Sequence, residues 1–173
     1  MEYELFAKMT DDSIRNSLIA LNMKTKQYGL MLTSEDISSI LAARTDTFIQ
    51  ESRIELGKSI IPKLIETFCD SPYIAQDNYR DSIIRLQEIF FHYKNETDDE
   101  LTDDELLAIM REQFDESCFG DFDLLEGTIL ELFAEAVRRG YRGYIESEGK
   151  GERIVSYWDR AAFNEAFQEL LEE

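Results

Sequence analysis

The sequence predicts an all-α protein, a single-domain bundle of six or seven helices with a small β-hairpin or ordered loop near the C-terminus. Apolar residues recur every three or four positions along most of the 173 residues, which gives each helix one apolar face. Only two prolines and eight glycines occur, fewer than a many-turned β protein needs. Because 43% of the residues are hydrophobic and 12% aromatic, we expect one core and one domain over residues 1–173.

Two long helices are expected at the start of the chain. A cap within residues 11–13 begins the first helix, and Gly29 ends that region. Residues 33–34 cap the second helix, whose first turn contains the acids that the helix dipole favours. This helix is expected to reach Leu56 unless the triplet at 45–47 breaks it in two.

Two further helices follow in the middle of the chain. Pro62 fits the first turn of a helix that ends near Phe68, because its missing N–H is not needed there. The next helix has apolar residues at spacings of four, three, four and three, and we expect them to be buried together: Tyr79, Ile83, Leu86, Phe90 and Tyr93.

The remaining elements are two acidic helices and a different C-terminal region. Thr102 caps a helix with three acids in its first turn, and another helix runs from about Leu125 to the Arg-Arg-Gly sequence at 138–140. Apolar pairs on either side of Glu148-Gly149-Lys150-Gly151 predict the hairpin or ordered loop between residues 142 and 157. Asp159 then caps a last amphipathic helix.

The charge of the chain is concentrated in residues 96–135. This segment has fifteen acidic residues and one basic residue, Arg111, and carries −14 of the net charge of −19. Because it is also rich in Leu, Ile, Met and Phe, we expect a rigid helical segment with its carboxylates outward. Six acids are candidates for contact with a basic partner: Asp98, Asp99, Glu100, Asp103, Asp104 and Glu105.

The composition also excludes several kinds of partner. An acidic field repels phosphate, so we expect no direct nucleic-acid binding and no contact with an anionic membrane. The N-terminus resembles no secretory signal, and no apolar run is long enough to span a membrane. Cys69 and Cys118 have no metal-type spacing and are expected to be free, buried thiols, which suits a cytoplasmic protein.

A polar row on the helix over 79–94 is a candidate catalytic or metal-binding site. Glu88, His92 and Glu96 are four residues apart, so a helix places them on one face. The same spacing is typical of a solvated ridge of ion pairs, which is the simpler interpretation. The acids around residue 100 lack the glycine and the final glutamate of an EF-hand loop, so we predict no metal site and no cofactor.

Arg44 is a candidate for binding a ligand or for a structural ion pair. If the helix from Ser34 is continuous, Arg44 lies on its apolar side, with Glu51 and Glu55 further along the same line. A partly buried guanidinium requires a carboxylate or an anionic ligand, because an unpaired buried charge is costly. A helix break near Asp46 would instead turn Arg44 outward.

Three hypotheses of function follow, and the sequence identifies no reaction. The first is a non-enzymatic protein-interaction module whose acidic helical surface binds a basic partner. The second is a small-ligand or metal-dependent enzyme with its site on the helix 79–94, and the third is a nucleic-acid mimic. The concentration of negative charge in residues 96–135 motivates the first, and no nucleophile motif, phosphate-binding loop or zinc motif occurs. The oligomeric state is left open.

Three segments, LTSEDISSILAAR, PKLIETFCDSPYI and LTDDELLAIM, resemble a family of small acidic bacterial proteins known as a domain of unknown function. The resemblance extends from about Met31 to Tyr141. It implies a bacterial cytosolic setting, and it brings no activity and no catalytic residues.

Overall fold

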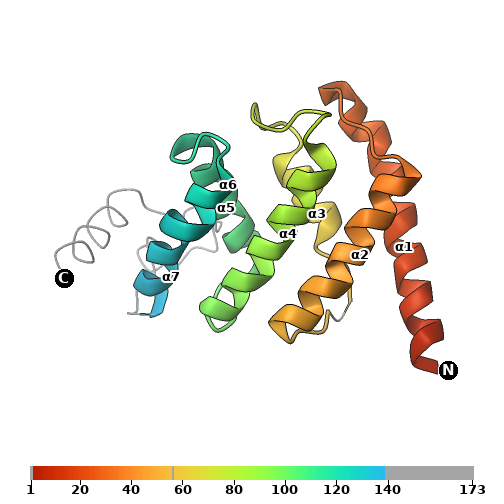
Figure 1. The fold of residues 1–173 in the computed structure, drawn as a ribbon, viewed down its shortest axis with the longest axis horizontal. Coiled ribbons are helices and arrows are strands. Elements are labelled where there is room, and N and C mark those ends of the chain that lie inside the picture. Colours follow the sequence, from red (N-terminus) through yellow and green to blue (C-terminus); the bar gives the residue numbers. More distant parts are fainter. Residues whose placement is uncertain (1, 56, 139–173) are drawn as a thin grey trace, which may run out of the picture. The chain divides into compact units, whose positions relative to one another are not determined.

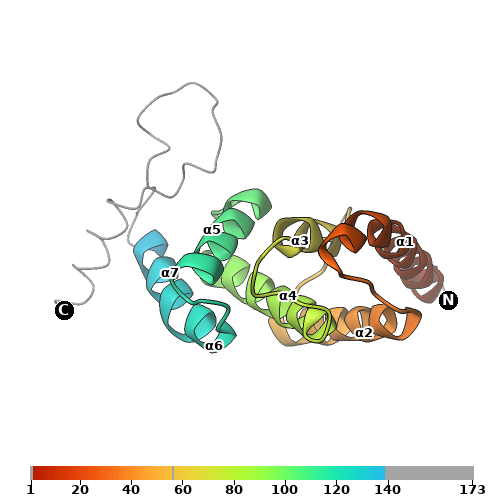
Figure 2. The ribbon, with the colours of Figure 1, turned by 90° about the horizontal axis from the view of Figure 1, so that it is seen from above.

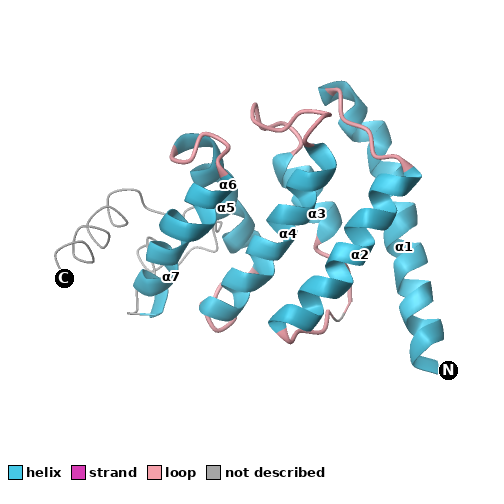
Figure 3. Cartoon of the chain, in the orientation of Figure 1, coloured by secondary structure: helices cyan, strands magenta, loops and turns pink. Residues whose placement is uncertain are grey.

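The computed structural model describes residues 2–55 and 57–138, and every regular element within them is helical (Figures 1 and 3). The predicted all-α class is therefore confirmed. The hairpin or ordered loop expected at 142–157 and the helix expected after Asp159 lie outside the described residues. None of the helices in the described ranges is long and apolar enough to cross a bilayer.

The chain divides into two compact units, Met1–Phe91 and His92–Glu173. Helix α4 (Tyr79–Glu96) contributes its residues up to Phe91 to the first unit and its last residues to the second. The organisation as a single domain stays a prediction, and the two units are described separately below.

The first unit begins with α1 (Glu2–Thr25), which a 3-10 turn, η1 (Lys26–Tyr28), extends. The prediction that residues 11–13 start this helix was wrong, because those residues lie inside it. Residues 4–9, Glu-Leu-Phe-Ala-Lys-Met, have good helix propensity and continue the helix toward the N-terminus. Three short polar residues in sequence are therefore not sufficient to identify a cap.

The connection after α1 is held by side-chain amides. Gly29 ends η1 with a φ of 75°, a left-handed conformation that favours glycine. The Asn22 amide then bonds both the N–H and the C=O of Leu32, at 2.8 and 3.0 Å. The Gln76 amide does the same for Met31, at 2.7 and 2.9 Å. These bonds satisfy backbone groups that belong to no helix and fix the start of the next one.

Helix α2 (Ser34–Glu51) is capped by Thr33, within the predicted pair 33–34, and the cap forms a capping box with Asp36. The Thr33 hydroxyl accepts from the Asp36 N–H, and the Asp36 carboxylate accepts from the Thr33 N–H. The helix is continuous through residues 45–47, so the predicted alternative of a break is excluded. It ends at Glu51 rather than near Leu56, because Ser52 takes a left-handed φ of 54°.

Helices α3 (Ile61–Phe68) and α4 complete the first unit. Pro62 lies in the first turn of α3, as predicted. The stripe predicted on α4 is confirmed, since each of its five members is at most 1% exposed. Figures 1 and 2 show α2 beside α4, and Phe48 meets Phe91 edge-on with ring centroids 4.8 Å apart. Packing of these two helices closes this part of the core.

The second unit contains α5 (Asp103–Glu116) and a run of helix from Phe122 to Arg138. That run consists of α6 (Phe122–Leu124), a π-helical turn labelled η2 (Leu125–Ile129), and α7 (Leu130–Arg138). Thr102 caps α5, as predicted, and Glu105 is its reciprocal partner in a capping box. Three apolar residues on one face of α5 are fully buried: Leu106, Met110 and Phe114.

The π-helical turn places one carbonyl out of register, and a tyrosine satisfies it. The Tyr93 hydroxyl donates to the Glu126 backbone carbonyl in a short hydrogen bond, and it lies 3.2 Å from Glu131 Oε2. Burial, followed by the nearby Glu131 carboxylate, raises the pKa of Tyr93. The phenol therefore stays protonated and serves as a donor that links the end of α4 to this turn.

Candidate functional site

The acidic segment 96–135 folds into helices and short turns with most of its carboxylates in solvent. Of its fifteen acidic side chains nine are exposed, five are half-buried and one, Glu105, is buried. Residues 92–138 hold these fifteen acids and three bases, a balance of −12. Residues 1–91 hold fourteen acids and ten bases, a balance of only −4. The negative charge is therefore concentrated on the second unit.

Lys94, the first of the three bases, lies in the last turn of α4, and its side chain contacts the acidic loop that follows. Its ammonium nitrogen is 2.7 Å from the Leu101 carbonyl and 3.0 Å from Asp103 Oδ1, and its side chain is only 9% exposed. Asp99 Oδ1 is 3.8 Å away. Both Asp98 and Asp99 have left-handed φ values, 52° and 56°, which Asp tolerates better than most residues. The lysine therefore holds the tight turn between α4 and α5.

Arg138 and Arg111 neutralise other parts of the segment. Arg138 donates to the backbone carbonyl and carboxylate of Glu96, at 3.0 and 3.1 Å, and to Glu135 Oε2 at 2.6 Å. The hydrogen bond with Glu135 is the main cause that raises the pKa of Arg138. Arg111 pairs with Asp115 at 2.7 Å along α5. All three bases thus bind carboxylates of the same segment.

The six predicted partner-binding acids separate into two groups. Asp98, Asp99 and Glu100 are exposed in the loop after α4, and Asp103 and Asp104 are exposed in the first turn of α5. Glu105 is different, because it is buried and its carboxylate lies 3.4 Å from the Thr102 backbone N–H. Its position as the third residue of the capping box explains that role, and the sequence contains the signal for it.

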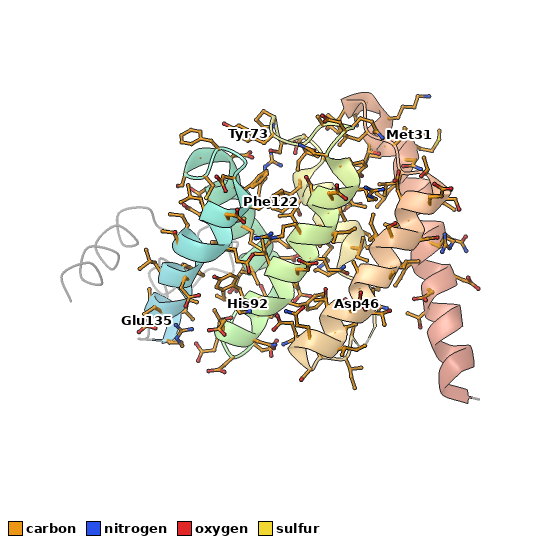
Figure 4. The ribbon with its side chains drawn as sticks, viewed as in Figure 1. Met31, Asp46, Tyr73, His92, Phe122 and Glu135 are labelled. Carbon is orange, nitrogen blue, oxygen red and sulfur yellow. The ribbon has the colours of Figure 1, made fainter. Side chains whose placement is uncertain are left out.

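The polar row on α4 does not form a metal centre. Glu88 is exposed, while His92 and Glu96 are half-buried. Figure 4 shows His92 on α4. Within the described part of the chain, no group of three His, Cys, Asp or Glu side chains is arranged to hold a metal ion. Glu96 instead binds Arg138. The geometry of Glu96 matches the ion-pair interpretation of this row.

Arg44 lies on the inner side of α2 and binds a carboxylate. Its Nε and Nη2 atoms lie 3.1 and 2.9 Å from Glu55 Oε1, and its guanidinium stacks on the Phe48 ring at 4.8 Å. Asp11 Oδ1 is 3.8 Å from Nη1. The other oxygen of Glu55 accepts from the Ile60 N–H at 3.1 Å. The arrangement joins α1, α2 and the start of α3 in one polar cluster.

Gln87 is a buried polar residue that sequence reasoning missed. It is 0% exposed, and neither its amide oxygen nor its amide nitrogen has a hydrogen-bond partner among the described residues. Gln87 lies four residues after buried Ile83 and four before buried Phe91, so helical spacing places it on the buried face of α4. This spacing was the signal available in the sequence. An unpaired buried amide lowers stability.

Both cysteines are free and buried, as predicted. Burial, with a smaller contribution from the Asp121 carboxylate, raises the pKa of Cys118 to about 11. The thiol is therefore protonated at neutral pH, and an acidic neighbour opposes the thiolate that a nucleophile requires. Cys118 has the environment of a structural residue.

The model of a protein family described as a family of unknown function (DUF6323) matches residues 17–143. The match contains the three segments in which the resemblance was recognised, and it confirms that resemblance. No curated protein and no solved structure matches the chain.

Proposed function

We propose that this chain, which belongs to the DUF6323 family of unknown function, is a non-enzymatic protein-interaction module that binds a basic partner through the acidic surface of its second unit. The observation that supports this proposal is the outward position of the carboxylates over residues 96–135. The two buried thiols suit a reducing compartment, so we place the protein in the cytoplasm.

The acidic surface favours a protein partner because its charges are fixed on ordered helices and turns. The basic residues Lys94, Arg111 and Arg138 bind carboxylates and carbonyls of this segment and so help to order it. Complementary charge mainly raises the rate of association and selects partners, and salt screens it over about 10 Å at 0.1 M. Binding should therefore weaken steeply as the salt concentration rises.

The test uses a labelled synthetic peptide in which lysines alternate with serines, and fluorescence anisotropy over a series of salt concentrations. We expect binding at low salt, with an affinity that falls continuously as salt is added. No binding at low salt, or an affinity that salt leaves unchanged, would contradict the proposal.

A charge-neutralising variant locates the surface. Replacing Asp98 and Asp104 with Asn and Glu100 with Gln keeps the capping box and leaves Asp99 and Asp103 to bind Lys94. Because Asn also tolerates the left-handed conformation, position 98 keeps its backbone. We expect this variant to bind the peptide at least about fivefold more slowly at low salt.

A matched control removes the same number of exposed carboxylates from the first unit. Asp12, Asp46 and Asp77 are all exposed there, and each is replaced with Asn. If the acidic surface of the second unit binds the peptide, this control stays within about twofold of the original protein. Equal losses in the two variants would show that net charge alone, and not this surface, is responsible.

A further inference from the structure

A large aromatic side chain is exposed at the turn between α5 and α6. Phe119 is 69% exposed, and Leu124, five residues later, is 37% exposed. Within residues 92–138 these are the large apolar side chains that remain in solvent, whereas the other apolar residues of that range contribute to the core or its edge. An exposed aromatic side chain at the tip of an ordered turn is a common anchor in protein interfaces.

The backbone holds Phe119 in place. Its φ is 50°, a left-handed conformation that is unusual for a bulky residue and normally favours Gly or Asn after a helix. Gly120 follows with a φ of 81°. The Gly120 N–H donates to the Phe114 carbonyl at 2.9 Å, and the Asp121 N–H donates to the Cys118 carbonyl at 3.0 Å. The ring is therefore presented by a defined turn, which lowers the entropic cost of binding.

The base of the turn is attached to the core. Phe122, at the start of α6, stacks on the fully buried Phe114, with ring centroids 5.0 Å apart and planes at 29°. Asp121 caps α6, since its Oδ1 accepts from the Leu124 N–H at 3.0 Å. These contacts hold the backbone between Phe119 and Leu124 in a defined conformation.

Exposed carboxylates flank this apolar pair in the sequence: Glu116, Asp121 and Asp123. They belong to residues 92–138, which have a charge balance of −12. Basic groups on a partner that covers the ring therefore meet a field of complementary sign. A second copy of the chain is a poor partner, because its residues 92–138 would bring the same balance of −12 against the first.

We propose that Phe119 and Leu124, flanked in the sequence by Glu116, Asp121 and Asp123, form the anchor point against which a basic amphipathic protein segment packs one large apolar side chain. This inference rests on the proposed function and specifies its partner. The partner carries Lys or Arg around a Leu- or Phe-like residue, and the anchor selects it from other basic chains.

The test compares two labelled peptides with the same lysines, one with leucines at helical spacing and one with serines in their place. We expect the original protein to prefer the leucine peptide by at least about tenfold. Phe119→Ala is expected to remove most of that preference while the serine peptide binds as before. Ile54→Ala, which shortens an 84% exposed apolar residue of the first unit, is expected to leave the preference unchanged.

A second variant separates loss of the ring from loss of the fold. Phe119→Gly removes the side chain and also relieves the left-handed backbone, so its melting temperature should rise while the preference for leucine is lost. If Phe119→Ala and Phe119→Gly keep the preference, the anchor is wrong, although salt-dependent binding of the serine peptide would still support the proposed function. If neither peptide binds the original protein, both proposals fail.

Self-association is measured on the same proteins by analytical ultracentrifugation. The inference expects the original protein and Phe119→Ala to have the same mass over the concentrations used. An oligomer that Phe119→Ala dissociates would show that a second copy occupies the site, and it would overturn the assignment to a basic partner.

Discussion

Replacing Lys94 with Met tests whether one buried ammonium holds the acidic turn between α4 and α5. Met keeps the length and apolar character of the side chain and removes the charge. In the native protein the ammonium donates to the Leu101 carbonyl at 2.7 Å and meets Asp103 at 3.0 Å. The variant leaves both groups without that donor.

The size of the effect follows from the two contacts. A buried polar group that loses its partner costs about 1–3 kcal/mol. The pair with Asp103 contributes less, about 0.2–1 kcal/mol, because that carboxylate side chain is 49% exposed. We therefore expect Lys94→Met to lower the free energy of unfolding by about 1–4 kcal/mol.

Hydrogen exchange measured by mass spectrometry reports the effect where it occurs. Three amides of the turn are hydrogen-bonded to the backbone: Asp98 to Asn95, Asp99 to Lys94, and Glu100 to Thr97, at 2.8–3.0 Å. We expect these amides to exchange at least about tenfold faster in Lys94→Met. The amides of α2, in the other unit, are the internal reference and should keep their protection.

Arg111→Met is the matched control, because it removes the same charge from the same acidic segment. Arg111 pairs with Asp115 one turn away, and both side chains are 23% exposed, so its loss should cost no more than about 0.5 kcal/mol. If Lys94→Met costs the same as Arg111→Met, the destabilisation reflects added net charge. The inference that Lys94 holds the turn would then be refuted.

Three further predictions concern the interior. Gln87→Met should raise the free energy of unfolding by about 1–3 kcal/mol, because it replaces an unpaired buried amide with an apolar chain of similar length, and a lower urea midpoint would show that the amide is paired. Arg44→Met should lower the free energy of unfolding, measured with urea, by about 3–5 kcal/mol, because the Glu55 carboxylate loses its cation. Adding Glu55→Gln should recover part of that loss. A double variant no more stable than the single one would contradict the pairing. The third concerns alkaline pH: burial, then the Asp121 carboxylate, raises the pKa of Cys118 from 9.0 to about 11, and burial above all raises the pKa of Tyr79 from 10.0 to about 12. Since the neutral forms are favoured in the native state, the stabilisation is complete below pH 9 and is lost between pH 9 and 12, by at most about 3 kcal/mol per group. Urea midpoints that stay level between pH 8 and 11 would exclude this linkage.

The elements that the sequence predicted well depend on short-range patterns. The α4 stripe needs only the 3.6-residue period, and its five members are all buried. The capping boxes at Thr33 and Thr102 need only a hydroxyl and an acid three residues later. Information of this kind lies within one or two helical turns, so one sequence is sufficient to read it.

Helix ends and the π-helical turn were harder to predict from the sequence, because they depend on backbone conformations that no pattern of apolar residues specifies. The left-handed φ at Ser52 ends α2 five residues before the glycine that was expected to do so. Similarly, the sequence predicted ordinary helix around Leu125, whereas the chain forms a π-helical turn there that Tyr93 satisfies. The partner of that turn is 33 residues away in sequence.

The ion pair of Arg44 shows the same limit, because the sequence did not identify which carboxylate binds the guanidinium. Helical spacing alone pointed to Glu51 and Glu55 as continuations of one line along a single helix. The carboxylate found on Arg44 is Glu55, which comes from the segment after Ser52, where the chain has left the helix. Glu55 lies beyond the end of α2 and reaches Arg44 because the chain turns back. Helical periodicity does not predict such a turn.

The positions of the basic residues explain how a segment with fifteen acids can be ordered and still present carboxylates to a partner. Lys94 is placed deeply enough that its charge offsets repulsion within the turn, and its 9% exposure leaves little of it for a partner. Arg138 binds the end of α4 to α7 through Glu96 and Glu135. These cations stabilise the fold from within, whereas Glu116, Asp121 and Asp123 are exposed and flank Phe119 in the sequence. Because stability and binding use different residues, Phe119→Gly can strengthen one while it weakens the other, and Lys94→Met can weaken the fold without removing a single carboxylate that a basic partner would contact.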